Sequence, residues 1–221
     1  MVEVQFHGFT FERWVRATLF GDYQGSYMQK WDVPPDENNH EALPSRFRGL
    51  PVSIKSAKYG SPIGLGDILR QRQIDRPFIM IVGFWNQRSP QKKWFEDIGW
   101  AHFSADDWSA LWGELAIEHI RPIDAIIKNL SEHYSSVRTK AQKWKRNTPE
   151  VKTSRIVVNP KIDSKTQRRI QCSLPFSEFW RQAGRQPQRC DHPSLFGFDF
   201  PNPVVSSART FNRGQVRGEP E

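Results

Sequence analysis

Residues 50–60 read Leu-Pro-Val-Ser-Ile-Lys-Ser-Ala-Lys-Tyr-Gly, and this stretch indicates a short strand. A proline opens it and a glycine closes it, so residues 52–55 can pair with a neighbouring strand. Successive side chains of a strand point to opposite faces, which puts Ser53 and Lys55 on one face and Ile54 on the other. The stretch therefore predicts a strand that presents a hydroxyl and an ammonium group to the same side.

An acidic residue stands some twenty residues upstream of this strand. Residues 26–31, Ser-Tyr-Met-Gln-Lys-Trp, form a strand-like run, and Asp32 follows it. Val33 and Pro34 come next, and pairing stops there because proline has no N–H to donate to a neighbouring strand. An acidic residue at a strand end, together with a lysine on the following strand, is the layout of a site that cuts phosphodiester bonds.

These residues resemble the active-site motif of the PD-(D/E)XK nuclease superfamily, and the resemblance covers roughly residues 8–85. In that superfamily, an Asp on one strand and an acidic-x-Lys triplet on the next hold Mg²⁺ and a water beside the phosphate. Here the triplet reads Ser53-Ile54-Lys55, so its acidic member is missing. A group of type II restriction endonucleases shows the same Ser-x-Lys departure and takes the carboxylate from a helix further downstream. This chain has Asp67 twelve residues after Lys55.

The resemblance implies a catalytic site and its cofactor. Asp32 and Asp67 would hold a hard divalent cation, Mg²⁺, through oxygen ligands. Lys55 would orient the attacking water or stabilise the transition state, and Ser53 takes the place of the missing carboxylate. Glu12 is the second candidate for that carboxylate, because many nucleases of this superfamily carry an acidic residue on a helix before the first core strand. The residues alone leave other roles open: Asp67 as a helix N-cap, and Glu12 as a glutamate favoured by a helix dipole.

The resemblance also implies a fold and a partner. The expected fold is α/β, with a restriction-endonuclease-like mixed sheet of about five strands flanked by helices and a basic hairpin region near the C-terminus. The expected activity is that of a type II restriction endonuclease, a cytoplasmic prokaryotic enzyme that cuts double-stranded DNA at a specific site. DNA sites with two-fold symmetry favour a homodimer. A nuclease core would cover residues 1–146, and a DNA-contacting region would cover residues 147–221.

Apolar patterns elsewhere predict the elements of the core. Residues 77–85 form a nearly continuous apolar run of strand length, which predicts a central strand covered on both faces. A helix capped by Thr10 is predicted before the first strand, with an apolar stripe along one face. Further predictions are a short helix over 67–73, a strand over 97–103, and helices over 104–119 and 121–144. Most of the nine tryptophans fall on such periodic positions, so we expect them to pack the core rather than stack on bases.

Positive charge is concentrated in the second half of the chain. The net charge is +8, but residues 1–120 hold 13 Lys/Arg against 15 Asp/Glu, whereas residues 121–221 hold 19 against 9. A one-sided field of this kind suits a polyanion such as DNA. A lysine-rich solvated surface is the alternative. The residues expected to contact phosphate are Lys58 and four at the end of the long helix: Arg138, Lys140, Lys143 and Lys145.

Residues 155–174 predict a basic hairpin. Two strand-like runs, 155–158 and 169–174, flank a loop rich in Lys, Arg, Gln, Asn and Ser. Arg bridges guanine O6 and N7, and Gln or Asn bridges adenine N6 and N7, so these side chains can read base edges. The alternative is a clamp that grips the DNA backbone without sequence preference. The candidate contacts are Lys161, Lys165, Gln167, Arg168, Arg169 and Gln171.

The sequence lacks the motifs that are typical of several other functions. Neither common glycine-rich phosphate-binding loop is present, so no nucleotide cofactor is expected. The histidines are scattered, and Cys172 and Cys190 have no close cysteine partner, so neither a zinc site nor a disulfide framework is expected. No leader and no apolar run of membrane-spanning length occur, so we expect an intracellular protein without a membrane anchor.

Two further functions fit the same residues. A nuclease of repair or transposition would share the active site but would prefer DNA structure or ends over a fixed sequence. A sequence-specific DNA-binding protein without catalysis would carry Ser53 as the mark of a dead site.

Overall fold

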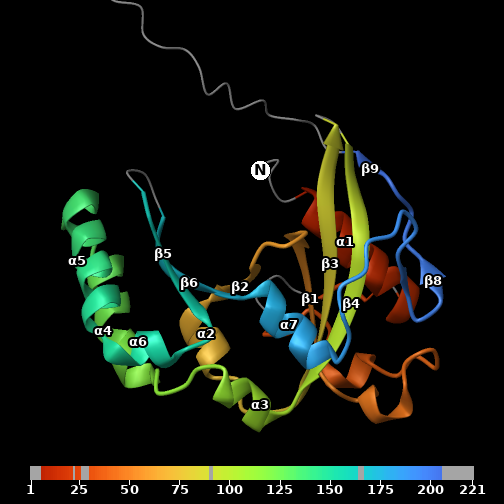
Figure 1. Cartoon of the computed structure of the whole chain (residues 1–221). Coiled ribbons are helices and arrows are strands. Elements are labelled where there is room, and N and C mark those ends of the chain that lie inside the picture. Colours follow the sequence, from red (N-terminus) through yellow and green to blue (C-terminus); the bar gives the residue numbers. More distant parts are fainter. Residues whose placement is uncertain (1–5, 22, 26–29, 90–91, 164–166, 206–221) are drawn as a thin grey trace, which may run out of the picture.

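The apolar run at residues 77–85 belongs to β3 (Phe78–Ser89), an interior strand of a four-stranded mixed sheet. The computed structural model describes residues 6–21, 23–25, 30–89, 92–163 and 167–205. Figure 1 shows how the elements are arranged. Strand β3 pairs in parallel with β1 (Val52–Lys58) and antiparallel with β4 (Lys92–Phe103), which in turn pairs with the short β9 (Val204–Val205). The predicted central strand is confirmed.

Apolar side chains on both faces of β3 build two cores. Ile79 and Ile81 pack with α1 (Phe6–Leu19), whereas Met80 and Val82 pack in the core that includes α7 (Phe176–Ala183). The two helices lie on opposite faces of the sheet (Figure 1). A strand between two layers needs apolar residues at every position, because successive side chains point to opposite faces. The continuous run therefore explains why β3 is an interior strand.

The first helix begins earlier than predicted. Helix α1 starts at Phe6, so the prediction that Thr10 caps it is wrong, and Glu12 lies beyond the first turn. A helix dipole acts within the first turn and does not account for a glutamate at this position. The predicted apolar stripe is confirmed by the full burial of Phe11, Val15 and Leu19.

A second sheet stands beside the first. It is antiparallel, with β6 (Arg168–Leu174) between β2 (Ile63–Asp67) and β5 (Val157–Ile162). The β5–β6 pair confirms the predicted hairpin. The expected single five-stranded sheet is not confirmed, because the strands divide between a sheet of four and a sheet of three. The chain turns at Gly60, whose φ is +78°, and β2 then pairs with β6 instead of joining β1.

The long helices predicted over 104–119 and 121–144 are wrong in their boundaries. Helix α3 (Ala105–Ala110) ends before Gly113, whose φ is +55°, and α4 (Ile117–Lys128) begins after it. A second break separates α4 from α5 (Tyr134–Asn147). There Asn129 accepts a hydrogen bond from the backbone N–H of Ser131, a local turn that competes with the helix. Helices α4 and α5 cover the outer side of β5 and β6 (Figure 1).

Short elements complete the fold. The predicted helix over 67–73 is confirmed as α2 (Ile68–Arg72). The predicted strand over 26–31 falls largely outside the described residues, and its last residues form a bend. The remaining elements are α6 (Pro149–Thr153), the 3₁₀ helices η2 (Pro35–Glu37) and η3 (Ser45–Phe47), and the two-residue strands β7 (Ser194–Leu195) and β8 (Phe198–Asp199).

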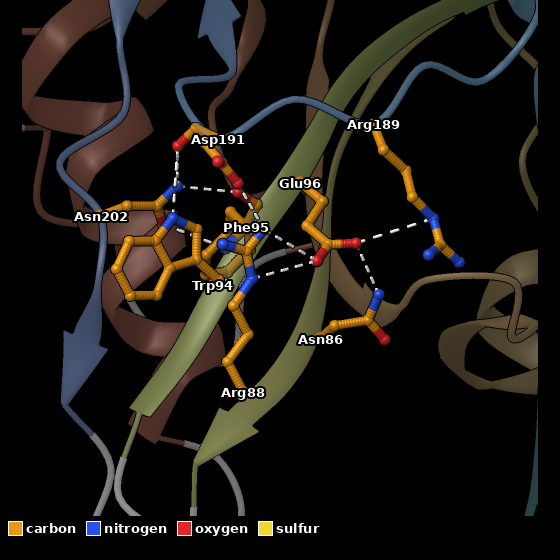
Figure 2. Close-up of polar contacts among 8 residues, drawn as sticks. All are labelled: Asn86, Arg88, Trp94, Phe95, Glu96, Arg189, Asp191 and Asn202. Atoms are coloured by element: carbon orange, nitrogen blue, oxygen red, sulfur yellow. Dashed lines mark hydrogen bonds and ion pairs between the residues drawn. The ribbon is translucent and has the colours of Figure 1, made fainter.

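The segment after α7 returns to β4 and is held there by a polar network, shown in Figure 2. Glu96 on β4 pairs with Arg88, which also pairs with Asp191. The side-chain amide of Asn202 bonds to both backbone groups of Phe95, in place of a strand partner. The network covers part of the β4 edge. Residues 147–221, the expected DNA-contacting region, thus contribute strands to both sheets. Residues 1–146, the expected nuclease core, contribute the other strands of the same two sheets.

None of the helices in the described ranges is long and apolar enough to cross a membrane. Cys172 is buried and Cys190 is exposed, and both are free thiols.

Replacing Gly83 with alanine should destabilise the fold. Gly83 lies on β3, and an added Cβ would come within 2.6 Å of the rings of Phe11 and Phe95, so α1 would have to shift. Overpacking of this kind lowers the free energy of unfolding by about 1–3 kcal/mol. Urea denaturation measures the change, and Gly64→Ala is the matched control because nothing lies within 4 Å of its added Cβ. A Gly83→Ala protein as stable as the wild type would contradict this packing.

Candidate functional site

The carboxylate of Asp32 binds to the edge of β1. Its Oδ2 atom accepts a hydrogen bond from the backbone N–H of Ile54 at 2.6 Å and forms an ion pair with Nζ of Lys55 at 2.8 Å. The hydroxyl oxygen of Ser53 lies 3.4 Å from the same atom. An antiparallel bridge between Val33 and Val52, at the start of β1, holds Asp32 in this position. The structure therefore brings together the three residues that the motif singled out.

The predicted division of side chains between the two faces of β1 is confirmed. Ile54 is buried in the core beneath α1. Ser53 and Lys55 instead line a pocket of about 430 Å³ on the other side of the strand. The alternation of side chains along a strand was enough to predict this division from the sequence.

Glu12 projects from α1 into the same pocket. Its carboxylate pairs with Arg16 at 2.7 Å, one helical turn further along. Burial raises the pKa of Glu12 above the ordinary value, and the charge of Asp32 raises this pKa further, whereas Arg16 and Lys55 lower it. The charge of Asp32 is thus close enough to disfavour the ionisation of Glu12.

Asp67 stands at the end of β2 and at the beginning of α2. Its carboxylate accepts a hydrogen bond from the backbone N–H of Arg70, so the N-cap interpretation is confirmed. The same residue also lines the pocket with Glu12, Asp32 and Lys55. The two roles are compatible, because a cap uses one carboxylate oxygen.

The pocket carries more positive than negative charge. Its carboxylates come from Glu12, Asp32 and Asp67, and its cations from Arg16, Lys30, Lys55, Arg70 and Arg169. A cavity with this excess of cations attracts a phosphate group and still offers carboxylate oxygens to a metal ion. The other residues that line it are Phe9, Trp31, Ser53, Leu65, Gly66, Gln71 and Gln171.

Two residues of the basic hairpin reach this pocket. Arg169 and Gln171 on β6 line it beside Asp67. The hairpin lies far from β1 in sequence, and the pairing of β6 with β2 brings it there. Two of the residues predicted to read bases thus share one cavity with the residues predicted to cut the backbone.

Sequence reasoning missed other residues of the pocket. Arg16 had a signal, because it follows Glu12 by four positions and such pairs meet on a helix. Lys30 and Trp31 precede Asp32 directly, and Arg70 follows Asp67 by three positions, so nearness in sequence to two predicted site residues was the available signal.

Two predicted phosphate contacts on α5 hold the helix to β5. Arg138 donates a hydrogen bond to the carbonyl of Ile162 at 2.8 Å, and Lys145 donates one to the carbonyl of Val158 at 2.7 Å. Lys140 pairs with a nearby glutamate. Helix α5 covers one face of the second sheet, and the pocket lies against the opposite face. These cations are therefore separated from the pocket by the sheet.

The remaining predicted DNA contacts fall into three groups. Arg168 donates a hydrogen bond to the carbonyl of Glu132, between α4 and α5, and lies on the strand face opposite Arg169. Lys165 lies outside the described residues. The exposed ones are Lys58, Lys143, Lys161 and Gln167.

The donor set of the pocket fits a hard divalent cation with few protein ligands. Among the residues that the structure describes, no group of three or more His, Cys, Asp or Glu is arranged to hold a metal ion. Mg²⁺ does not require such a group, because proteins commonly bind it through one or two carboxylates plus water and substrate phosphate. Glu12 and Asp32 supply two carboxylates whose mutual repulsion a cation would relieve.

No known protein family, curated protein or solved structure matches this chain.

The Asp32→Asn substitution should lower the pKa of Glu12. It removes a neighbouring negative charge that raises this pKa, and it frees Lys55, whose charge lowers it. A carboxyl-detected NMR titration of the full chain measures the shift. Asp36→Asn, an exposed change on η2, is the control that should leave the pKa of Glu12 in place. An unchanged pKa in the Asp32 variant would mean that the two carboxylates are not coupled.

Proposed function

We propose that this protein is a Mg²⁺-dependent type II restriction endonuclease that hydrolyses phosphodiester bonds at a specific site in double-stranded DNA. The observation that carries the proposal is the shared pocket. It unites Asp32, Ser53 and Lys55 with further carboxylates and with Arg169 and Gln171. A catalytic lysine, oxygen ligands, phosphate-binding cations and base-reading side chains are the parts that site-specific DNA cleavage needs.

Lys55 has the position of the catalytic cation. It is held by Asp32 on one side and by the carbonyl of Ile54 on the other, at 3.0 Å. An ammonium group placed in this way can orient a water or stabilise negative charge that develops on the phosphate. Arg16, Arg70 and Arg169 would hold the DNA backbone or bases around it.

Asp32 would provide one metal ligand, and Glu12 would provide the second. Sequence spacing favoured Asp67 as the second ligand. We choose Glu12 instead, because the charge of Asp32 raises the pKa of Glu12, which indicates that these two carboxylates lie close together. When bound, Mg²⁺ would lower the pKa of a water and offset charge on the phosphate. Protons compete for a carboxylate with a raised pKa, so Mg²⁺ should bind more tightly as pH rises through the pKa of Glu12.

A duplex site with two-fold symmetry requires two copies of the pocket, one for each strand. We therefore propose that the enzyme acts as a homodimer.

The Lys55→Ala variant should lose DNA cleavage and keep DNA binding. Loss of one charge-stabilising donor reduces the rate by about 10²- to 10³-fold, whereas the other cations of the pocket remain. Plasmid digestion with Mg²⁺ measures cleavage, and a gel shift with the same preparation measures affinity. Lys92→Ala removes an exposed lysine on β4 and should cut normally. Parallel loss of binding and cutting would make Lys55 a residue that grips phosphate.

The digestion of the wild type also separates the alternative functions. Discrete bands support a restriction endonuclease, whereas a smear or trimming of ends supports another nuclease. Binding without any cutting supports a DNA-binding protein in which Ser53 marks a dead site.

The Glu12→Gln variant should be inactive at every Mg²⁺ concentration, whereas Asp67→Asn should cut within about tenfold of the wild type. Asparagine caps a helix as well as aspartate does, so the second change spares α2. A Mg²⁺ titration of the cleavage rate compares the two variants. An active Glu12→Gln protein beside an inactive Asp67→Asn protein would assign the second carboxylate to Asp67.

A further inference from the structure

Almost all of the net charge of the chain comes from one segment. Residues 134–162, which include α5, α6 and β5, hold eight Lys/Arg and one acidic residue, Glu150, whereas the whole chain has a net charge of +8. The other residues are therefore close to neutral as a group. A field of this kind attracts a polyanion to the segment.

Half of these eight cations are already engaged within the protein. The four with a hydrogen bond or an ion pair are Arg138, Lys140, Lys145 and Arg155. Lys143 and Arg146 on α5 differ from them. Both are exposed, and their side chains have no hydrogen bond or ion pair in the ranges that the structure describes. These two cations are therefore available to a ligand.

Lys143 and Arg146 lie on the side of α5 that faces away from the second sheet. The buried residues of this helix are Val137 and Ala141, and at about 3.6 residues per turn the two cations lie on the opposite side. The exposed residues of that side, which we call the outer face, are Ser135, Ser136, Thr139, Gln142, Lys143 and Arg146. The helix contains no acidic residue. Cations accompanied by hydroxyl and amide groups are the side chains that contact DNA phosphates.

The second sheet separates the outer face from the pocket. Ile170 of β6 is buried in the same core as Val137 of α5, whereas Arg169 and Gln171 of β6 line the pocket. Successive side chains of a strand point to opposite faces, so α5 and the pocket lie on opposite sides of β6. Figure 1 shows α5 at one edge of the molecule. Its outer face is thus directed away from the pocket.

One duplex cannot fill both surfaces without a sharp bend. A sheet and a helix lie between them, and the helix alone is about 10 Å in diameter. Double-stranded DNA is stiff over about 150 base pairs, and bending it within a binding site raises its energy. A duplex held in the pocket therefore leaves the outer face of α5 open to another segment of DNA.

We infer that the outer face of α5 binds the phosphate backbone of a second segment of duplex DNA, separate from the segment in the pocket. Contacts of lysine and arginine with phosphate carry no base information, so this binding is independent of sequence. The inference rests on the proposed function for the first segment and goes beyond it, because hydrolysis needs the pocket alone.

A bridging assay with the full chain tests this inference. One duplex is fixed to beads, the protein is added without Mg²⁺, and a fluorescent duplex follows. Fluorescence stays on the beads only if the protein holds both duplexes. We expect the wild type to retain the fluorescent duplex. The Lys143→Ala/Arg146→Ala double variant should lose it and should itself remain on the beads through the pocket.

The matched control is the Arg76→Ala/Lys92→Ala double variant. It also loses two exposed cations, but both lie outside residues 134–162, so bridging should persist. The single change Lys143→Ala should lower the salt slope of bridging by about one unit, as expected for one lost phosphate contact.

Lysine acetylation of the wild type, measured by mass spectrometry, tests the same surface without any substitution. An excess of duplex should protect Lys143, whereas the exposed Lys92 should react as it does without DNA. Unchanged acetylation of Lys143 would overturn the inference.

The failures are distinguishable. Equal retention by the wild type and the Lys143/Arg146 double variant would overturn the inference, because bridging would then come from the two pockets of a homodimer. A wild type that holds one duplex at a time would overturn it as well, and neither result affects the proposed function. A protein that bridges duplexes but cuts none with Mg²⁺ would overturn the proposed function and leave the second DNA surface standing.

Discussion

The pairing of β6 with β2 is the contact on which the candidate site depends. These strands come from distant parts of the chain, and their pairing carries Arg169 and Gln171 to Asp67, beside Lys55. Hydrophobic burial favours this pairing, because Ile170 and its apolar neighbours on β6 are buried in the same core as apolar residues of α4 and α5. The polar face follows as a consequence. The apolar side chains on one face of β6 thus determine the position of Arg169 and Gln171 on the other face.

Local patterns in the sequence predicted those parts of the fold that depend on nearest neighbours. Alternation along β1 gave the faces of Ser53 and Lys55, and the apolar run gave the interior strand β3. The division into two sheets was missed, because the choice of partner for β2 depends on residues a hundred positions away. The helix breaks were missed for a different reason. The apolar stripe continues across Gly113 and Asn129, so spacing alone does not reveal that the backbone turns there.

Electrostatics and sequence spacing favour different candidates for the second carboxylate of the proposed metal site. Asp67 matches the downstream carboxylate of the resembled enzymes, yet Glu12 has the raised pKa that burial and the nearby charge of Asp32 produce. Glu12 is therefore held in an unfavourable state when ionised, and a bound cation would relieve it. The neutral Ser53 in the motif agrees with this arrangement. It removes a third negative charge from the immediate surroundings of Asp32, where Glu12 already supplies the second.

Positive charge in the sequence is a poor guide to where DNA would bind. The cations of α5 made this helix a candidate surface, but Arg138 and Lys145 donate to backbone carbonyls of β5 and help to hold the two elements together. A cation that donates to a partly buried carbonyl is less available to a phosphate, because its release removes the protein partner of that carbonyl. Arg169 carries no such cost, since its side chain projects into the pocket without a protein partner in the described ranges. What separates a binding cation from a structural one in this fold is therefore its existing hydrogen bonds, which composition does not show.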